Sequence, residues 1–332
     1  MPGLITHYIC GQGVLQALPN EIAVVIEKHR RLYNIGCQGP DIFFYYLSGA
    51  LKKGLRGIGT KMHNENVGAF LRAVADGLAQ LSDDERTGVF AYFCGYLTHY
   101  CLDCATHPYV YYKTGFLRED DSDLRRINRL KFLAYHMRFE TAIDVLLLNM
   151  VAGKKPRDEK LWRLIKVNRK EVRQVADFIG GCINAAYGVN IFGKNVLAAM
   201  THMAFLTRFF QSKRGLRKGV LAVGEHVVLR SAVASNLIHS QSIKENIDYL
   251  NEDKNTWKVP WDDKTERNES FAELLETAET EAAKLIQLLW DCLENDGDLE
   301  KFLDIAGDRS FKTGRPIEER PVFTVYDVVF KR

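Results

Sequence analysis

The stretch Asp83–His107 reads DDERTGVFAYFCGYLTHYCLDCATH and decides which fold the chain can adopt. It follows Ser82 and opens with a capping-box-like helix start. We expect a helix from about Glu85 toward Cys104 that stops before Pro108, because proline disfavours the interior of a helix. The side chains are apolar nearly all round this helix, which predicts a central, buried position.

Helical spacing of apolar residues recurs outward from this segment in both directions, and only eight prolines interrupt the 332 residues. The further helices that we expect cover residues 21–33, 64–81, 123–152, 158–180, 192–211, 218–239 and 270–295. Residues 252–270 predict a structured loop, and the tail from Gly307 reads as irregular, with 322–326 as the strand-like stretch. The fold class is therefore all-α. Because no convincing linker precedes residue 245, we expect a helical domain over 1–245 and a C-terminal helical extension over 246–332 packed on it.

The charge balance and the cysteines limit the classes of protein that the chain can belong to. A net charge of +3 gives no support for a surface that coats a polyanion. The N-terminal residues lack the pattern of a secretory signal, and no 18-residue apolar segment predicts a membrane span. Seven scattered cysteines show no disulfide framework, so we expect reduced thiols and a cytoplasmic protein.

The strongest chemical signal is His99-x3-Asp103-x3-His107 within the expected buried helix. Steps of four residues place all three side chains on one stripe of the helix. Imidazole and carboxylate groups on a buried stripe must be paired or bound to metal, because their unpaired burial is costly. Three ligand-type residues in phase are difficult to explain by packing, so this triple favours a metal site.

Other candidate ligands lie outside the triple. His136-x3-Glu140 is a second pair with helical spacing, Asp41 follows Gly39-Pro40, and His63 is expected to begin the helix of residues 64–81. His7 lies within the first turn of the chain. Each of these has a simpler interpretation: a hydrogen-bonded core histidine, a surface ion pair, a turn cap or an exposed residue. The remaining histidines are interpreted as structural: His29, His202, His226 and His239.

The ordered set of motifs resembles the zinc-dependent phospholipase C family. The order is His, Gly-Pro-Asp, His, His-x3-Asp-x3-His and His-x3-Glu, and the resemblance covers roughly residues 1–150. That family includes bacterial phospholipases C, P1-type nucleases and phospholipase-D-like enzymes acting on glycosylphosphatidylinositol. The resemblance implies a multi-helix bundle that holds two or three zinc ions and hydrolyses phosphodiesters with zinc-activated water.

The resemblance also implies a role for each candidate ligand. His63, His99, Asp103 and Asp41 would hold one zinc, and His107, His136 and Glu140 a second. His7 would help to hold a third, with Asp103 bridging, and Asp41 would also act as the catalytic base. In the secreted bacterial phospholipases a processed N-terminal Trp completes the third site. Here no Trp precedes His7, and removal of Met1 would leave a new terminal amine at Pro2 to substitute for it.

Three function classes remain open at this point. The first is a phosphodiesterase for a small phosphodiester or a phospholipid, with peripheral membrane contact. The second is a P1-type nuclease or phosphatase, which the near-neutral charge does not favour. The third is a zinc-binding protein that has the ligands but no turnover.

Overall fold

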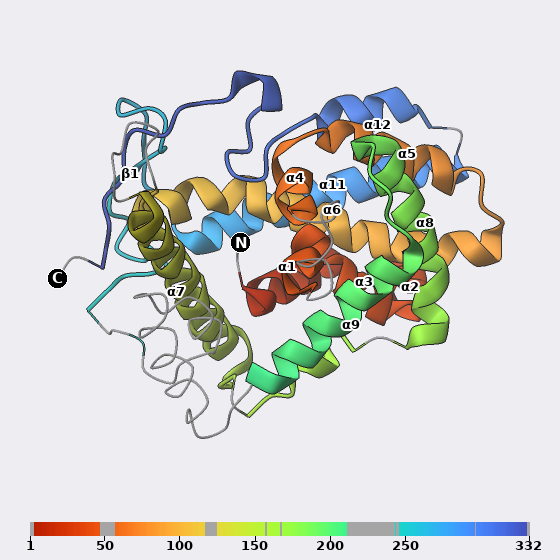
Figure 1. Cartoon of the computed structure of the whole chain (residues 1–332), viewed down its shortest axis with the longest axis horizontal. Coiled ribbons are helices and arrows are strands. Elements are labelled where there is room, and N and C mark those ends of the chain that lie inside the picture. The colour runs from red at the N-terminus through yellow and green to blue at the C-terminus, as the bar shows by residue number, and fades with distance from the viewer. Residues whose placement is uncertain are drawn as a thin grey trace.

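The computed structural model describes residues 3–46, 57–116, 125–156, 158–166, 168–210, 243, 246–295 and 297–330, and side chains there except at 125–129 and 210. Helices dominate this part of the chain, which confirms the all-α prediction (Figure 1). The α-helices are α1 Leu4–Ala17, α2 Asn20–Lys28, α3 Arg30–Gly36, α4 Ile58–Asn64, α5 Val67–Leu78, α6 Asp83–Thr114, α7 Arg125–Ala152, α8 Arg169–Tyr187, α9 Gly193–Phe210, α11 Phe271–Glu294 and α12 Leu299–Ala306. Short 3-10 helices are η1 Gly39–Tyr45, η3 Leu161–Arg163 and η5 Ile317–Glu319, and β1 Trp257–Lys258 pairs antiparallel with β2 Glu266–Arg267.

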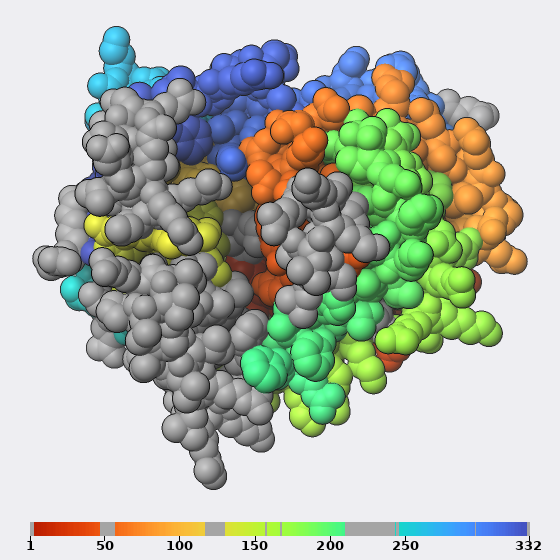
Figure 2. Space-filling model, viewed as in Figure 1, coloured from red at the N-terminus to blue at the C-terminus, as the bar shows by residue number. Residues whose placement is uncertain are grey.

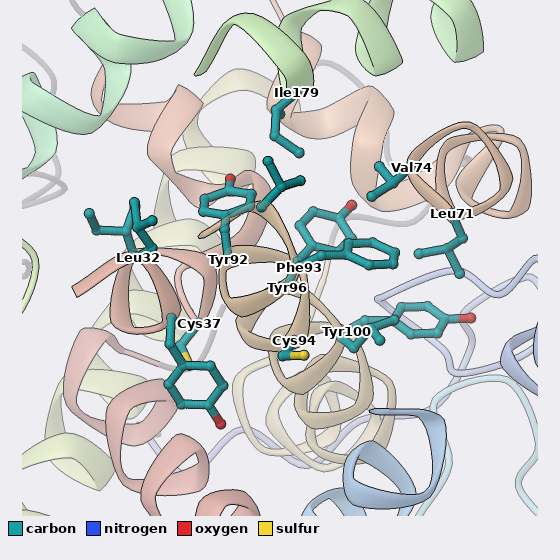
Figure 3. Packing of buried hydrophobic residues seen from close by; sticks show 14 of the residues in the cluster. Leu32, Cys37, Leu71, Val74, Tyr92, Phe93, Cys94, Tyr96, Tyr100 and Ile179 are labelled. Carbon is teal, nitrogen blue, oxygen red and sulfur yellow. The ribbon is translucent and has the colours of Figure 1, made fainter. Parts of the chain in front are cut away.

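Helix α6 is the central element, as its apolar surface predicted. It packs against α3 and α11, and most of its residues between Val89 and Val110 are buried. Figure 3 shows its side chains Tyr92, Phe93 and Tyr96 among residues of the surrounding helices. The crossing with α3 is close, because a Cβ on Gly36 would lie 2.0 Å from the carbonyl oxygen of Tyr92. This packing fixes α6 as the scaffold for the side chains on its other faces.

The predicted end of this helix before Pro108 is wrong. Helix α6 continues through Pro108 to Thr114 and ends at Gly115, whose φ of 77° suits glycine. Tyr109 and Val110, which follow the proline, are fully buried. Packing on both sides of Pro108 therefore outweighs the loss of one backbone hydrogen bond. Tyr111 lies in this extension of the helix, and Phe116 follows the helix end at Gly115.

One predicted helix is divided in two, and another begins later than predicted. The stretch 21–33 breaks at His29 between α2 and α3, and its backbone there leaves the helical region with φ −115° and ψ 32°. His63 was expected to begin the helix of residues 64–81, but it lies near the end of α4. Helix α5 begins after Asn66, which adopts a left-handed conformation with φ 49°. Neither break carries a proline or glycine, so periodicity alone did not reveal it.

The other helix predictions have mixed outcomes. Helices α7, α9 and α11 match the stretches 123–152, 192–211 and 270–295 closely, whereas 158–180 contains η3 and only the first part of α8. The stretch 218–239 lies outside the described residues, as do His226 and His239. The strand-like tail 322–326 forms no strand in the described structure, and α1, α4 and α12 were not predicted.

The C-terminal residues pack on the N-terminal helices. Helix α11 starts at a capping box in which Ser270 and Glu273 exchange hydrogen bonds, and its buried face contacts α6 and α1. The division of the chain at residue 245 stays a prediction. None of the described helices is long and apolar enough to span a bilayer.

Candidate metal centre

Helix α6 places His99, Asp103 and His107 on one buried stripe, as the four-residue spacing requires. The three side chains are at most 2% exposed. Asp103 lies at the middle of the group. Its Oδ2 is 3.3 Å from His99 Nε2 and 3.7 Å from His107 Nδ1. One carboxylate therefore reaches both imidazoles of its own helix.

Side chains from α1, η1 and α4 converge on the same carboxylate. His7 Nε2 of α1 lies 3.5 Å from Asp103 Oδ1, and His63 Nε2 of α4 lies 3.6 Å from Asp103 Oδ2. Asp41 of η1 approaches the same Nε2 of His63, with its Oδ1 at 3.1 Å. Gly39, two residues earlier, has a φ of 48°, and a Cβ there would lie 2.4 Å from the ring of His99. Glycine thus lets the Asp41 loop approach the imidazole directly.

Helix α7 supplies the third group of side chains. His136 Nε2 is 2.8 Å from Glu140 Oε1, and His107 Nε2 is 3.9 Å from the same oxygen. The ring of Tyr111 lies against both histidines, with centroid distances of 4.8 Å to His136 and 5.7 Å to His107. All eight residues singled out in the sequence therefore lie in one interior region.

Three sets of these side chains have ligand atoms within 4.8 Å of one another. The sets are His7, Asp41 and His99; His63, His99 and Asp103; and His107, His136 and Glu140. The last set is the one implied for the second zinc. The set that contains His7 differs from the one that the resemblance implies, because it joins His7 to Asp41 and His99 rather than to Asp103. The rings of His7 and His99 are stacked, with centroids 4.1 Å apart.

Backbone carbonyls orient three of the imidazoles. The Nδ1 atoms of His63, His99 and His107 lie 2.6 Å from Gly59 O, 3.2 Å from Cys37 O and 2.7 Å from Phe311 O. A carbonyl accepts only, so in the neutral form of each imidazole Nδ1 carries the proton and Nε2 keeps its lone pair. Metal-ligating histidines are commonly held in this way.

The atoms that face the centre have no hydrogen-bond partner within the described part of the chain. They are both ring nitrogens of His7, Nε2 of His63, His99 and His107, Oδ1 of Asp41, and both carboxylate oxygens of Asp103. Buried nitrogen and oxygen atoms left in this state cost free energy unless a ligand satisfies them. Neutral imidazoles and carboxylates are donors that suit zinc, so these residues fit it.

Burial and the mutual contacts shift the pKa values of the centre in the absence of metal. Burial lowers the pKa of His107 and His136. Burial and the nearby charge of His99 both lower the pKa of His7. Burial also opposes a charge on His99, but the Asp103 and Asp41 carboxylates outweigh it and raise its pKa. Despite burial, His107 and His99 hold the pKa of Asp103 well below its usual range. Most of the imidazoles are thus neutral and ready to bind metal.

The metal-free protein should lose stability as the pH falls below about 6.5. The folded pKa values of His7, His107 and His136 lie below the unfolded value, so the unfolded chain binds more protons as the pH falls and is stabilised relative to the folded chain. His99 has a raised pKa and acts in the opposite direction. Urea unfolding with a chelator should give a free energy of unfolding about 2 kcal/mol lower at pH 5.5 than at pH 7.0. Equal stability at the two pH values would show that these imidazoles are protonated in the fold.

Sequence reasoning missed two residues that shape the centre. Asp144 is buried, and its carboxylate accepts hydrogen bonds from the backbone N–H of Ile5 and Thr6 and from the Thr6 hydroxyl, the last at 2.7 Å. It thereby fixes the start of α1, which carries His7. A further four-residue step beyond His136-x3-Glu140 would have revealed it. Phe311 contacts His63 and His107 through its backbone N–H and carbonyl. Every residue type has these backbone groups, so the sequence does not indicate this role.

Of the histidines interpreted as structural, the two that the structure describes lie outside the three sets. His202 of α9 stacks on Tyr46 with ring centroids 5.9 Å apart, and His29 lies at the break between α2 and α3. Met1 and Pro2 lie outside the described residues, so substitution by the terminal amine stays a prediction.

The comparisons agree with the geometry. Residues 6–188, more than half of the chain, match the family model described as zinc-dependent phospholipase C. No match was found among curated proteins or solved structures. The matched residues include all eight side chains of the centre, whereas Phe311 lies beyond them. The helical architecture, the buried His, Asp and Glu sets and the family match together show that this chain belongs to the zinc-dependent phospholipase C family.

Proposed function

We propose that the protein hydrolyses the phosphodiester bond of a phospholipid-like substrate with bound zinc. One observation carries the proposal: three sets of buried ligand atoms lie in one region around Asp103, and within each set the atoms are at most 4.8 Å apart. Zinc bound by such residues lowers the pKa of coordinated water toward about 7 and neutralises charge that develops on phosphoryl oxygens.

The chain's own residues hold and orient the reacting groups. His63, His99 and Asp103 would hold one ion, and His107, His136 and Glu140 another. The set of His7, Asp41 and His99 would use the same Nε2 of His99 as the first set, so a third ion would be held by His7 and by Asp103 Oδ1, which lies 3.5 Å from His7 Nε2. Asp41 is the residue that we propose as the base. Its Oδ1 lies 3.1 Å from His63 Nε2 and has no hydrogen-bond partner within the described structure, so it can accept a proton there. The carbonyls of Gly59, Cys37 and Phe311 keep the imidazoles in the ligating tautomer.

Hydrolysis assays on metal-depleted and zinc-reloaded protein test this function. Reloaded protein should hydrolyse a short-chain phospholipid, and activity should fall at least about 100-fold after chelation and return with zinc. A single-stranded oligonucleotide in the same assay tests the nuclease alternative. Zinc-loaded protein that cleaves neither substrate would contradict the proposal and favour a non-catalytic zinc-binding protein.

A further inference from the structure

A cavity of about 730 Å³ is lined by residues that neighbour the metal centre, and none of the eight candidate ligands is part of its wall. Its wall includes Asn64 and Tyr111, and Asn64 directly follows His63 in α4. The Tyr111 ring contacts His107 and His136. Its size suits a small organic ligand. In the view of Figure 2, the surface is hollowed between the orange atoms of α4 and the yellow atoms of α7, the helices that carry His63 and His136.

The C-terminal segment 310–323 supplies nine of the fourteen residues that line this cavity. They are Ser310, Lys312, Thr313, Pro316, Ile317, Arg320, Pro321, Val322 and Phe323. All nine lie beyond the family match, which ends at residue 188. The metal ligands thus belong to the family region, whereas most of the cavity wall is outside it. What the cavity accepts must therefore be argued from these side chains.

The segment is joined firmly to the metal centre through Phe311. Its backbone N–H donates to His63 O at 3.0 Å, and its carbonyl accepts from His107 Nδ1 at 2.7 Å. The ring is fully buried against His63, with centroids 4.9 Å apart. Ser310 and Lys312, on either side of Phe311, line the cavity. The cavity wall is therefore fixed in position relative to the ligands.

Basic side chains distinguish the polar part of the wall. Lys312 and Arg320 line the cavity, and Glu65 is the one carboxylate in its lining. The neighbouring Arg309 and Arg315 are engaged in ion pairs, with Glu281 at 2.8 Å and Glu319 at 2.5 Å. Arg320 has no ion pair within the described residues. Its backbone adopts a left-handed conformation with φ 40°, which is uncommon outside glycine and occurs at functional positions.

Aromatic side chains form another part of the wall. Phe323 lies edge-on to both Tyr111 and Phe116, with centroid distances of 5.3 and 5.0 Å. This surface suits an apolar part of a ligand next to the polar part. A guanidinium and an ammonium in the same cavity favour an anionic group, since arginine recognises phosphates and carboxylates through paired donors.

We propose that the cavity binds the head group of the substrate and that this head group carries a second anionic group, a phosphate or a carboxylate. Arg320 is its principal partner, and Lys312 assists. The inference rests on the proposed function for the cleavage step, but anion binding by the cavity does not depend on zinc.

The test compares three short-chain lipids that dissolve as monomers, with choline, serine or inositol 4-phosphate as the head group. Zinc-loaded wild type should show kcat/KM at least tenfold higher for the serine or the inositol phosphate lipid than for the choline lipid. Arg320→Gln should reduce that preference about tenfold. Arg315→Gln, in the same segment but outside the cavity lining, should leave it within twofold. The two anionic lipids show whether carboxylate or phosphate is preferred.

Two results would overturn the proposal: a preference for choline in the wild type, or an anion preference that Arg320→Gln leaves intact. If no lipid is hydrolysed, the proposed function fails separately. The cavity is then tested by titrating metal-free protein with inositol 1,4-bisphosphate. Binding that weakens at least fivefold in Arg320→Gln but not in Arg315→Gln supports the anion site. Equal binding by all three proteins refutes it.

Discussion

Replacement of Asp103 by asparagine should remove at least one zinc ion per chain and reduce zinc-dependent hydrolysis by at least about 100-fold. Asp103 is fully buried and approaches His7, His63, His99 and His107 within 3.7 Å. Asparagine has nearly the same shape, so the fold should survive. The neutral amide removes the negative charge and one acceptor atom, and both weaken the binding of a divalent ion.

Elemental analysis and thermal unfolding with and without zinc give the measurements for this variant. Wild type should gain about 2.7 kcal/mol of stability at a zinc concentration 100 times the Kd, and the variant should gain clearly less. Asp84→Asn is the matched control, because Asp84 is an exposed carboxylate at the other end of α6. Equal zinc content in the two variants would exclude Asp103 as a ligand.

Truncation of Phe311 to alanine should weaken zinc binding by about 10- to 100-fold, although Phe311 itself is not a ligand. Its ring packs on His63 and His99, and its backbone pairs with His63 and His107. Without the ring, the segment around it can shift, and the carbonyl no longer holds His107 in place. The free energy of unfolding should also fall by about 3–5 kcal/mol, because a large buried side chain is lost.

Phe302→Ala separates these two effects. Phe302 of α12 is equally buried, and its ring has no contact with the metal centre among the described interactions, so its truncation should cost similar stability without a change in zinc affinity. Phe311→Leu keeps most of the apolar volume and should restore much of the affinity. Competition with a zinc-binding dye measures all three variants. If Phe311→Ala and Phe302→Ala bind zinc equally, Phe311 has only a packing role.

The side chains of the centre could be predicted from the sequence because their spacing follows the helix. His99, Asp103 and His107 share one stripe of α6 because a step of four residues returns to the same face, and the same holds for His136 and Glu140 of α7. The ordered motifs added His7, Asp41 and His63 through the family resemblance. The structure shows all eight side chains in one region.

The remaining features depend on contacts that a sequence pattern does not record. The break at His29 has no glycine or proline to mark it, and Pro108 is tolerated only because α6 is packed on both sides. The carbonyls of Gly59, Cys37 and Phe311 contribute through their positions, and any residue type has a carbonyl. Periodicity predicts which face of a helix is buried, but not which distant backbone covers it.

The contact between Phe311 and His107 has a consequence for biosynthesis. The eight proposed ligands are made early, within the first 140 residues, but the peptide that holds His107 in place is made more than 200 positions after it. A ribosome-bound chain that has folded its N-terminal helices therefore presents the ligands without this support. Stable metal loading must follow the arrival of residues 309–314, which makes acquisition of the ion a late step in maturation.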